Sequence, residues 1–134
     1  IDKKSLTLEA AQKIAAASLA EARANNLNLV IAIVDDGGHL ITLSRMETAQ
    51  YGSVDVAIAK AKTAAAFRRP TKLFEDMAKS RPTLATIANA SLLEGGVPII
   101  HNGQVIGAVG ISGATAQQDT QVAETGINSL GLTR

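Results

Sequence analysis

An Asn-Gly dipeptide at 102–103, set between two apolar runs, constrains the fold of this chain more than any other feature of its sequence. Both central residues of a two-residue type I′ hairpin turn have positive φ, and Asn-Gly is strongly preferred there. We therefore predict antiparallel strands over 97–101 and 104–112. A parallel arrangement is the weaker alternative, because two residues cannot form the crossover that parallel strands need.

A second pair of apolar runs, 29–34 and 40–44, flanks the turn sequence Asp-Asp-Gly-Gly. The glycines adopt positive φ without strain and the first run is rich in β-branched residues, so we predict a second antiparallel hairpin. Each hairpin places one of the chain's two histidines at its turn, His39 in the first and His101 in the second. The turns that determine the fold therefore also carry the only imidazoles.

Helical segments are predicted around the hairpins. Apolar residues recur at helical spacing after an N-cap at Thr7 and stop at 25–26. The other predicted helices are an Ala-rich one over 50–67, a shorter one to Lys79 with Thr71 as its N-cap, a weak one through 87–89 after an interruption at Pro82, and a last one that begins at Ser112 or Thr115. Together these elements predict an α+β fold: a central antiparallel sheet of four or more strands, flanked by helices in two or three layers.

Length and composition predict a single domain over 1–134. With 46% hydrophobic residues, the chain can bury about two-thirds of its unfolded surface. A net charge of +1 attracts neither nucleic acid nor an anionic membrane, and two Phe and one Tyr provide no stacking platform for single strands. No apolar run is long enough to span a membrane, and the lack of cysteine excludes thiolate chemistry. We expect a cytoplasmic location; an exported protein that has lost its signal peptide is the alternative.

The two histidines are the first candidates for chemistry. One axial imidazole and an apolar slot suffice for haem iron, so His39 or His101 is a candidate ligand, and a solvated turn histidine is the alternative for each. A metal site is a further alternative, in which the two histidines combine with carboxylates. The carboxylates considered are Asp35, Asp36, Glu47 and Glu94.

Other residues are candidates for holding an anion. Arg45, Lys60 and Lys62 would pair with haem propionates or with a small acid, and salt-bridged or solvated roles are the alternative for each. Ser112 precedes a predicted helix, whose N-terminus is able to hold a carboxylate or phosphate. Gly107 and Gly110, in the same run, indicate a bulge, tight helix packing or a close ligand, and the sequence leaves these alternatives open.

Several ordered motifs in this chain resemble one protein family. They lie at 34–40 (Val-Asp-Asp-Gly-Gly-His-Leu), 45–49 (Arg-Met-Glu-x-Ala), 60–64 (Lys-Ala-Lys-Thr-Ala), 94–98 (Glu-Gly-Gly-Val-Pro) and 107–113 (Gly-Ala-Val-Gly-Ile-Ser-Gly), and Asp119 and 123–126 continue the series. Over nearly the whole chain they are similar to the GlcG/HbpS family. That family includes haem-binding proteins, glycolate-operon proteins and the C-terminal domain of propanediol-utilisation corrinoid adenosyltransferases.

The resemblance implies a profilin-like fold and assembly into homo-oligomers, often octamers. It also implies haem or a related tetrapyrrole as the ligand, because parts of the family bind haem. On this basis His39 is the preferred iron ligand and His101 the second choice. The full predicted ligand-binding set is His39, Arg45, Lys60, Gly95 and Gly96.

Two other functions are alternatives. In the first, an enzyme or enzyme-accessory protein acts on a small anionic catabolic intermediate. Arg45 and Lys60 would then orient the anion, Glu47 or Asp35 would exchange a proton, and the helix start after Ser112 would stabilise an oxyanion. In the second, the chain is a structural or regulatory assembly subunit, since Ala-rich and Gly-rich surfaces suit close packing between copies.

Overall fold

The computed structural model describes residues 1–132. Its strands form one four-stranded antiparallel sheet in the order β2-β1-β4-β3. They are β1 (Val30–Asp35), β2 (Leu40–Arg45), β3 (Gly96–His101) and β4 (Gln104–Ser112). Both predicted hairpins are present, and the pairing of β1 with β4 joins them. The prediction of a central antiparallel sheet is confirmed.

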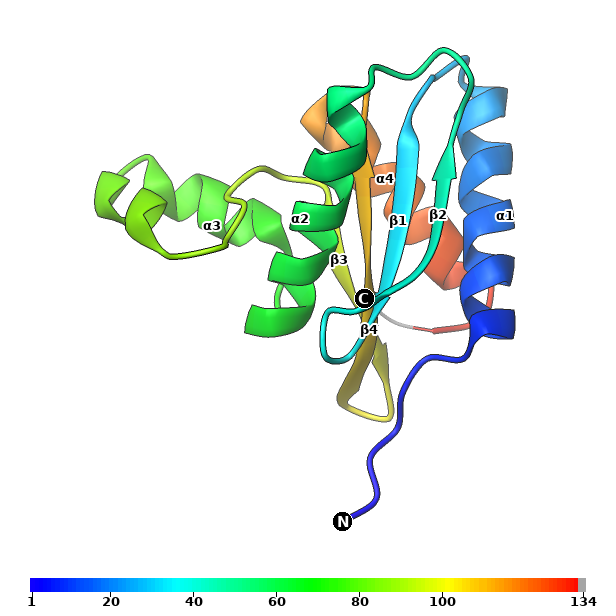
Figure 1. Ribbon diagram of the computed structural model, residues 1–134, viewed down its shortest axis with the longest axis horizontal. Coiled ribbons are helices and arrows are strands. Elements are labelled where there is room, and N and C mark those ends of the chain that lie inside the picture. The colour runs from blue at the N-terminus through cyan, green and yellow to red at the C-terminus, as the bar shows by residue number, and fades with distance from the viewer. Residues whose placement is uncertain (133–134) are drawn as a thin grey trace.

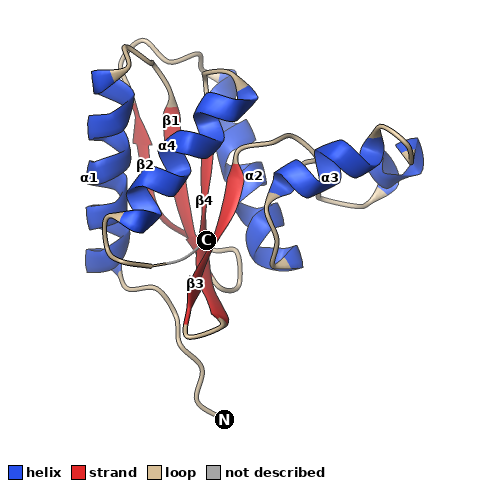
Figure 2. Cartoon of the chain, turned by 180° about the vertical axis from the view of Figure 1, so that it is seen from behind, coloured by secondary structure: helices blue, strands red, loops and turns tan. Residues whose placement is uncertain are grey.

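Helices cover both faces of the sheet, which gives three layers (Figure 1). They are α1 (Leu8–Ala24), α2 (Gly52–Phe67), α3 (Thr71–Ala78) and α4 (Ala116–Asn128), with a 3₁₀ helix, η1, over Pro82–Thr86. α1 and α4 pack on one face, and α2 packs on the other. α3 and η1 project from the body (Figure 2). Within residues 1–132, no helix has the length and hydrophobicity needed to cross a lipid bilayer.

The central strand β1 is buried on both faces. Ile31 and Ile33 lie in the core under α1 and α4, while Val30, Ala32 and Val34 pack toward α2. A strand covered on both sides has a continuous apolar sequence rather than an alternating one. This explains why the predicted strand over 29–34, which became β1, contains no polar residue.

Gly110 allows α2 to lie directly on the sheet. A Cβ atom at this position would overlap the carbonyl oxygen of Ala57 and lie 2.6 Å from the backbone nitrogen of Ala61. Tight helix packing is therefore the role that the structure gives this glycine. Gly107 lies instead against the backbone of β1, where a Cβ atom would be 2.5 Å from the carbonyl oxygen of Val34.

The second hairpin turn has the conformation that its sequence predicts, and in the first only one of the two glycines, Gly38, has the predicted positive φ. Asn102 and Gly103 have φ of 50° and 77°, the paired positive values of a type I′ turn. In the first hairpin, Gly38 has φ of 83°. The Asp35 carboxylate accepts hydrogen bonds from two backbone N–H groups of that turn, each at 2.9 Å, so it stabilises the turn itself.

Thr71 does not cap α3, so that prediction was wrong. Pro70 occupies the N-cap, and the Thr71 hydroxyl accepts a hydrogen bond from the Gly96 N–H at 2.9 Å. Thr71 is fully buried, and its hydroxyl satisfies a donor of β3 instead of a donor of its own helix.

The segment after Pro82 also differs from the prediction. η1 begins at Pro82, and 87–89 form a bend and turn rather than a helix. Proline is well suited to the first turn of a helix, because the N–H that it lacks would have no partner there. At the last helix, Thr115 rather than Ser112 is the N-cap, and Gln118 completes a capping box.

The two ends of the sheet carry different residues. We call one of them the hairpin end, because both hairpin turns lie there, and with them His39 and His101. The opposite, helix-start end holds the ends of β2 and β4 and the starts of α2, β3 and α4 (Figure 1). Arg45 and Ser112 lie there, paired with Val30 from either side.

Candidate functional site

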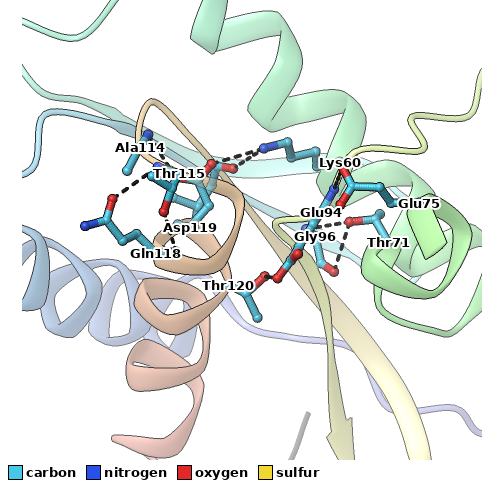
Figure 3. A network of polar contacts seen from close by, with 11 residues as sticks. Lys60, Thr71, Glu75, Glu94, Gly96, Ala114, Thr115, Gln118, Asp119 and Thr120 are labelled. Carbon is cyan, nitrogen blue, oxygen red and sulfur yellow. Dashed lines mark hydrogen bonds and ion pairs between the residues drawn. The ribbon is translucent and has the colours of Figure 1, made fainter.

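A polar pocket of about 480 Å³ lies at the helix-start end. Segments far apart in the sequence meet around it, and Figure 3 shows their polar contacts. Its ionisable lining residues are Lys60, Glu75, Glu94 and Asp119, and its other lining residues include Gln50, Ser53, Val56, Leu93 and Ser112.

Lys60 and Asp119 form a buried ion pair at this pocket. The Lys60 ammonium lies 3.2 Å from Asp119 Oδ2 and donates to the Ile111 carbonyl oxygen at 2.9 Å. The two side chains are 5% and 3% exposed. Charges removed from water to this extent are tolerated when their remaining hydrogen bonds are satisfied, and Asp119 Oδ1 accepts one from the Ala114 N–H at 3.1 Å.

Gly95 and Gly96 make room for Lys60. A Cβ atom at Gly95 would lie 2.8 Å from Lys60 Nζ, and one at Gly96 would overlap the Lys60 carbonyl oxygen. The backbone at Gly95 also has φ of 129°, which residues with a side chain rarely adopt. These two glycines therefore bring β3 close to α2 and shape the wall behind the ammonium.

Burial raises the pKa of Asp119 to about 6, although the attraction of Lys60 and the Ala114 hydrogen bond limit the rise. The carboxylate therefore changes protonation state not far below neutral pH.

The Asp119 carboxylate also lies against the start of α4, where the sequence predicts a bound anion. The Ala114 N–H that would hold such an anion, or an oxyanion near Ser112, is bonded to a carboxylate of the chain itself.

Glu94 and Glu75 add negative charge to the pocket. Glu94 is 7% exposed, and the Thr120 hydroxyl donates to its Oε2 at 2.9 Å. Its backbone N–H lies 3.4 Å from Glu75 Oε1. Within residues 1–132, neither carboxylate forms an ion pair with a basic side chain. The pocket is therefore acidic despite the presence of Lys60.

A second pocket, of about 370 Å³, lies at the hairpin end beside His101. The His101 side chain is exposed, and its Nε2 lies 3.3 Å from Asn102 Nδ2. The pocket therefore combines an accessible imidazole with a mainly aliphatic wall. The wall consists of Leu6, Ala10, Ile106, Leu130 and Leu132, and Ser5 and Thr7 add hydroxyl groups.

The predicted ligand-binding set does not form one site. Lys60 and Ser112 line the polar pocket, and the two predicted glycines pack behind Lys60. His39 lines neither this pocket nor the apolar one. Its side chain is 83% exposed, and its Nδ1 lies 3.3 Å from the Asp35 carboxylate.

Arg45 and Glu47 lie next to the polar pocket but outside its lining. The Arg45 guanidinium stacks over the Tyr51 ring, 5.5 Å from its centroid. Glu47 lines a neighbouring hollow that shares only Gln50 with the polar pocket. The predicted pairing of Arg45 with Lys60 around one anion is therefore not formed, because Lys60 is buried and already paired.

The metal site considered from the sequence is absent from the described part of the chain. No group of three or more His, Asp or Glu side chains there is arranged to hold a metal ion. The reason is topological, since each histidine lies at the turn of its own hairpin while Glu94 lies at the other end of the sheet.

Sequence reasoning missed the roles of Asp119 and Glu75. The signal for Asp119 is its position three and four residues before Val122 and Ala123, on the buried stripe of α4. A carboxylate on an apolar stripe needs a partner in the core. That partner, Lys60, is 59 residues away in the sequence, so only the folded structure identifies it.

Comparison with known proteins decides the family. A family model described as "Haem degrading protein HbpS-like" matches residues 6–128. This chain belongs to the HbpS-like family. Protein GlcG of Escherichia coli (strain K12) is 46% identical to this HbpS-like chain over 108 residues, which cover 80% of the chain and 81% of GlcG. The resemblance found in the sequence motifs is confirmed.

Solved structures share the fold of this HbpS-like chain. Klebsiella pneumoniae protein ORFY has a TM-score of 0.91 at 32% identity, covering 98% of this chain and 94% of ORFY. A double mutant of Streptomyces reticuli HbpS has a TM-score of 0.91 at 32% identity, covering 98% and 90%. A PduOC:haem complex has a TM-score of 0.88 at 25% identity, covering 96% and 97%. One structure with this fold is thus a haem complex.

Proposed function

We propose that this HbpS-like protein binds haem or a related tetrapyrrole in the apolar pocket at the hairpin end, with His101 as the iron ligand. The position of His101 beside a mainly aliphatic pocket carries this proposal. An apolar slot for the macrocycle and one axial ligand for the iron are the two features that haem requires. The haem complex of PduOC, which shares the fold, supports the same class of ligand.

The contact of His101 with Asn102 favours ligation through Nε2. An amide nitrogen only donates hydrogen bonds, so in the 3.3 Å contact Asn102 Nδ2 is the donor and His101 Nε2 is the acceptor. In this tautomer Nδ1 carries the ring proton and Nε2 carries the lone pair. The exposed Asn102 side chain can turn away, and the same lone pair is then available to iron.

Basic side chains near the apolar pocket suit the haem propionates. Lys3 and Lys4 directly precede Ser5, which lines the pocket, and they line another hollow together with Arg68. Lys3 is paired with Asp36 at 3.0 Å. Lys4, the direct neighbour of Ser5 in the chain, forms no ion pair within residues 1–132, and we assign a haem propionate to it.

Titration with haemin tests this assignment, and the two histidines provide a matched pair of variants. The wild-type protein is expected to give a saturable Soret band that is shifted from that of free haemin. His101→Ala is expected to weaken binding about tenfold or more, whereas His39→Ala leaves the affinity within about twofold. An unchanged free-haemin spectrum contradicts haem binding. A larger effect of His39→Ala contradicts the choice of His101 and restores the order expected from the sequence.

We also propose that the chain forms a homo-oligomer, with an octamer as the expected size. α3 projects from the body and exposes Leu73 and Met77. Exposed apolar side chains that cluster on a projecting element are typical of contacts between copies. Light scattering coupled to gel filtration measures the mass directly, and a monomer contradicts the assembly.

The polar pocket does not favour the alternative of a small anionic substrate. Lys60, the one basic residue in its described lining, is paired with Asp119. Glu75 and Glu94 would repel an anion. The same charges favour a different class of ligand.

A further inference from the structure

We infer that the polar pocket at the helix-start end is a second binding site, which takes a small organic cation that carries a hydroxyl group. The inference does not rest on haem binding, because it concerns other residues at the other end of the sheet. It rests on a cavity of about 480 Å³ whose lining combines two largely buried carboxylate residues, Glu94 and Asp119, with two largely buried serines whose hydroxyl groups have no hydrogen-bond partner within residues 1–132.

Charge determines which ligands this pocket accepts. Lys60 contributes one positive charge to the lining, while Glu75, Glu94 and Asp119 contribute three negative charges. The contact between Lys60 and Asp119 neutralises one charge of each sign. Two negative charges remain, so an anion is repelled on entry and a cation is attracted.

Glu94 provides the strongest contact for a cation. Its side chain is buried, its Oε2 accepts from the Thr120 hydroxyl at 2.9 Å, and no described residue donates to its Oε1. This oxygen is not fully enclosed, so a donor or a cation in the pocket can reach it. Glu75 lines the same pocket and adds a second carboxylate to it; its Oε1 lies 3.4 Å from the Glu94 backbone nitrogen.

The chain does not supply this cation from a neighbouring lysine. The charges of Glu94 and Glu75 contribute to the raised pKa of Lys72 on α3, after the larger effect of Asp76. However, the Lys72 ammonium is hydrogen-bonded to Asp76 at 2.9 Å, and Lys72 does not line the pocket.

Two serines indicate that the ligand also carries a hydroxyl group. Ser53 and Ser112 line the pocket and are 6% and 8% exposed. Neither hydroxyl has a hydrogen-bond partner within residues 1–132, and neither is fully enclosed, because no fully enclosed side-chain oxygen there lacks a partner. A ligand in the pocket that the two serines line can therefore reach them. Val56 and Leu93 provide apolar wall for a short carbon chain. No group of three or more His, Asp or Glu side chains among the described residues is arranged to hold a metal ion, so the pocket favours an organic cation.

Isothermal titration calorimetry with three matched four-carbon compounds tests the inference. 4-Amino-1-butanol, 1,4-butanediol and 4-hydroxybutyrate share a hydroxyl group and differ in charge at the other end. The amino alcohol is expected to bind, the diol to bind about tenfold or more weakly, and the hydroxy acid to give no measurable heat. Absence of binding by the amino alcohol, equal affinities, or preference for the hydroxy acid would each overturn the inference.

Charge-removing variants locate the site. Glu94→Gln retains the shape of the side chain and an acceptor for Thr120, and it is expected to lower the affinity for 4-amino-1-butanol about tenfold or more. Asp76→Asn, the matched control, removes the same charge from an exposed residue outside the pocket and is expected to change the affinity by less than about twofold. Equal effects of the two variants would overturn the inference.

Two further measurements keep the test decisive. Glu75→Gln changes a half-buried residue, is expected to weaken binding about threefold, and replaces Glu94→Gln if that variant does not fold. Haemin affinity is expected to be the same in wild type and Glu94→Gln. A wild-type protein that binds 4-amino-1-butanol but not haemin would count against the proposed function alone, and a wild-type protein that binds haemin but not 4-amino-1-butanol would count against this second site alone.

Discussion

The two ends of the sheet carry pockets that differ in how they depend on the fold. At the helix-start end, Lys60 and Asp119 are buried charges that hold α2 and α4 to the end of β4. At the hairpin end, His101 is an exposed side chain beside an aliphatic wall, and its side-chain polar contact is with the adjacent Asn102. At the polar pocket, therefore, residues that line the site also stabilise the fold, and changing them should affect both binding and stability. At the apolar pocket, changing His101 should affect binding alone.

Lys60→Met is expected to have the largest effect on stability. It leaves the Asp119 carboxylate buried without its cation, so the free energy of unfolding near neutral pH should fall by roughly 3–5 kcal/mol. Lys62→Met is the matched control on the exposed side of the same helix and should change it by less than about 0.5 kcal/mol. Urea unfolding followed by circular dichroism measures both, and similar losses would contradict the importance of the buried pair.

Asp119 should make stability depend on pH. Its pKa rises on folding from 3.8 to about 6, so between these values the native state binds more protons than the unfolded state. The free energy of unfolding should therefore fall as pH rises through this window, by on the order of 2–3 kcal/mol. Urea unfolding of the wild type and Asp119→Asn between pH 4 and pH 7 measures the effect. The same pH dependence in both proteins would show that another group is responsible.

Gly96→Ala and Gly103→Ala compare how much stability each end of the sheet loses when a glycine gains a Cβ atom. At Gly96, a Cβ atom would overlap the Lys60 carbonyl oxygen and lie 2.8 Å from Thr71 Cγ2, so we expect a loss of about 3 kcal/mol. At Gly103 nothing lies within 4 Å, and the φ of 77° alone should cost about 1 kcal/mol. Thermal unfolding of both variants gives the order, and a larger loss at Gly103 would refute the packing argument.

His101→Ala should have the smallest effect on stability, less than about 0.5 kcal/mol, because the His101 side chain is exposed and its polar contact is with the adjacent Asn102. Thermal unfolding without ligand checks this. A marked loss of stability would mean that the hairpin end is coupled to the fold after all, and that weaker haemin binding by this variant reports misfolding.

The sequence predicted the elements whose signals act over a few residues. The Asn-Gly turn requires only its own backbone angles, and the Thr7 hydroxyl caps α1 by accepting from the Ala10 N–H, three residues away. Prediction failed at Thr71, where a buried contact with β3 replaced the expected local cap.

The pockets were not predictable in the same way, because they depend on contacts between distant segments. Lys60 was a candidate from the sequence, but its pairing with Asp119 changes it from an anion receptor into part of a neutral pair. His39 and His101 have similar local surroundings in the sequence. What distinguishes them is an apolar wall from α1 and from residues beyond α4, which reaches only His101.

Hydrogen–deuterium exchange with and without haemin tests most directly the claim that the two ends hold separate sites. Bound haem is predicted to slow amide exchange in peptides that cover 5–10 and 98–107. Exchange in peptides that cover 91–96 and 112–119 should remain unchanged. Slower exchange confined to the second set, or equal in both, would contradict the placement of haem at the hairpin end.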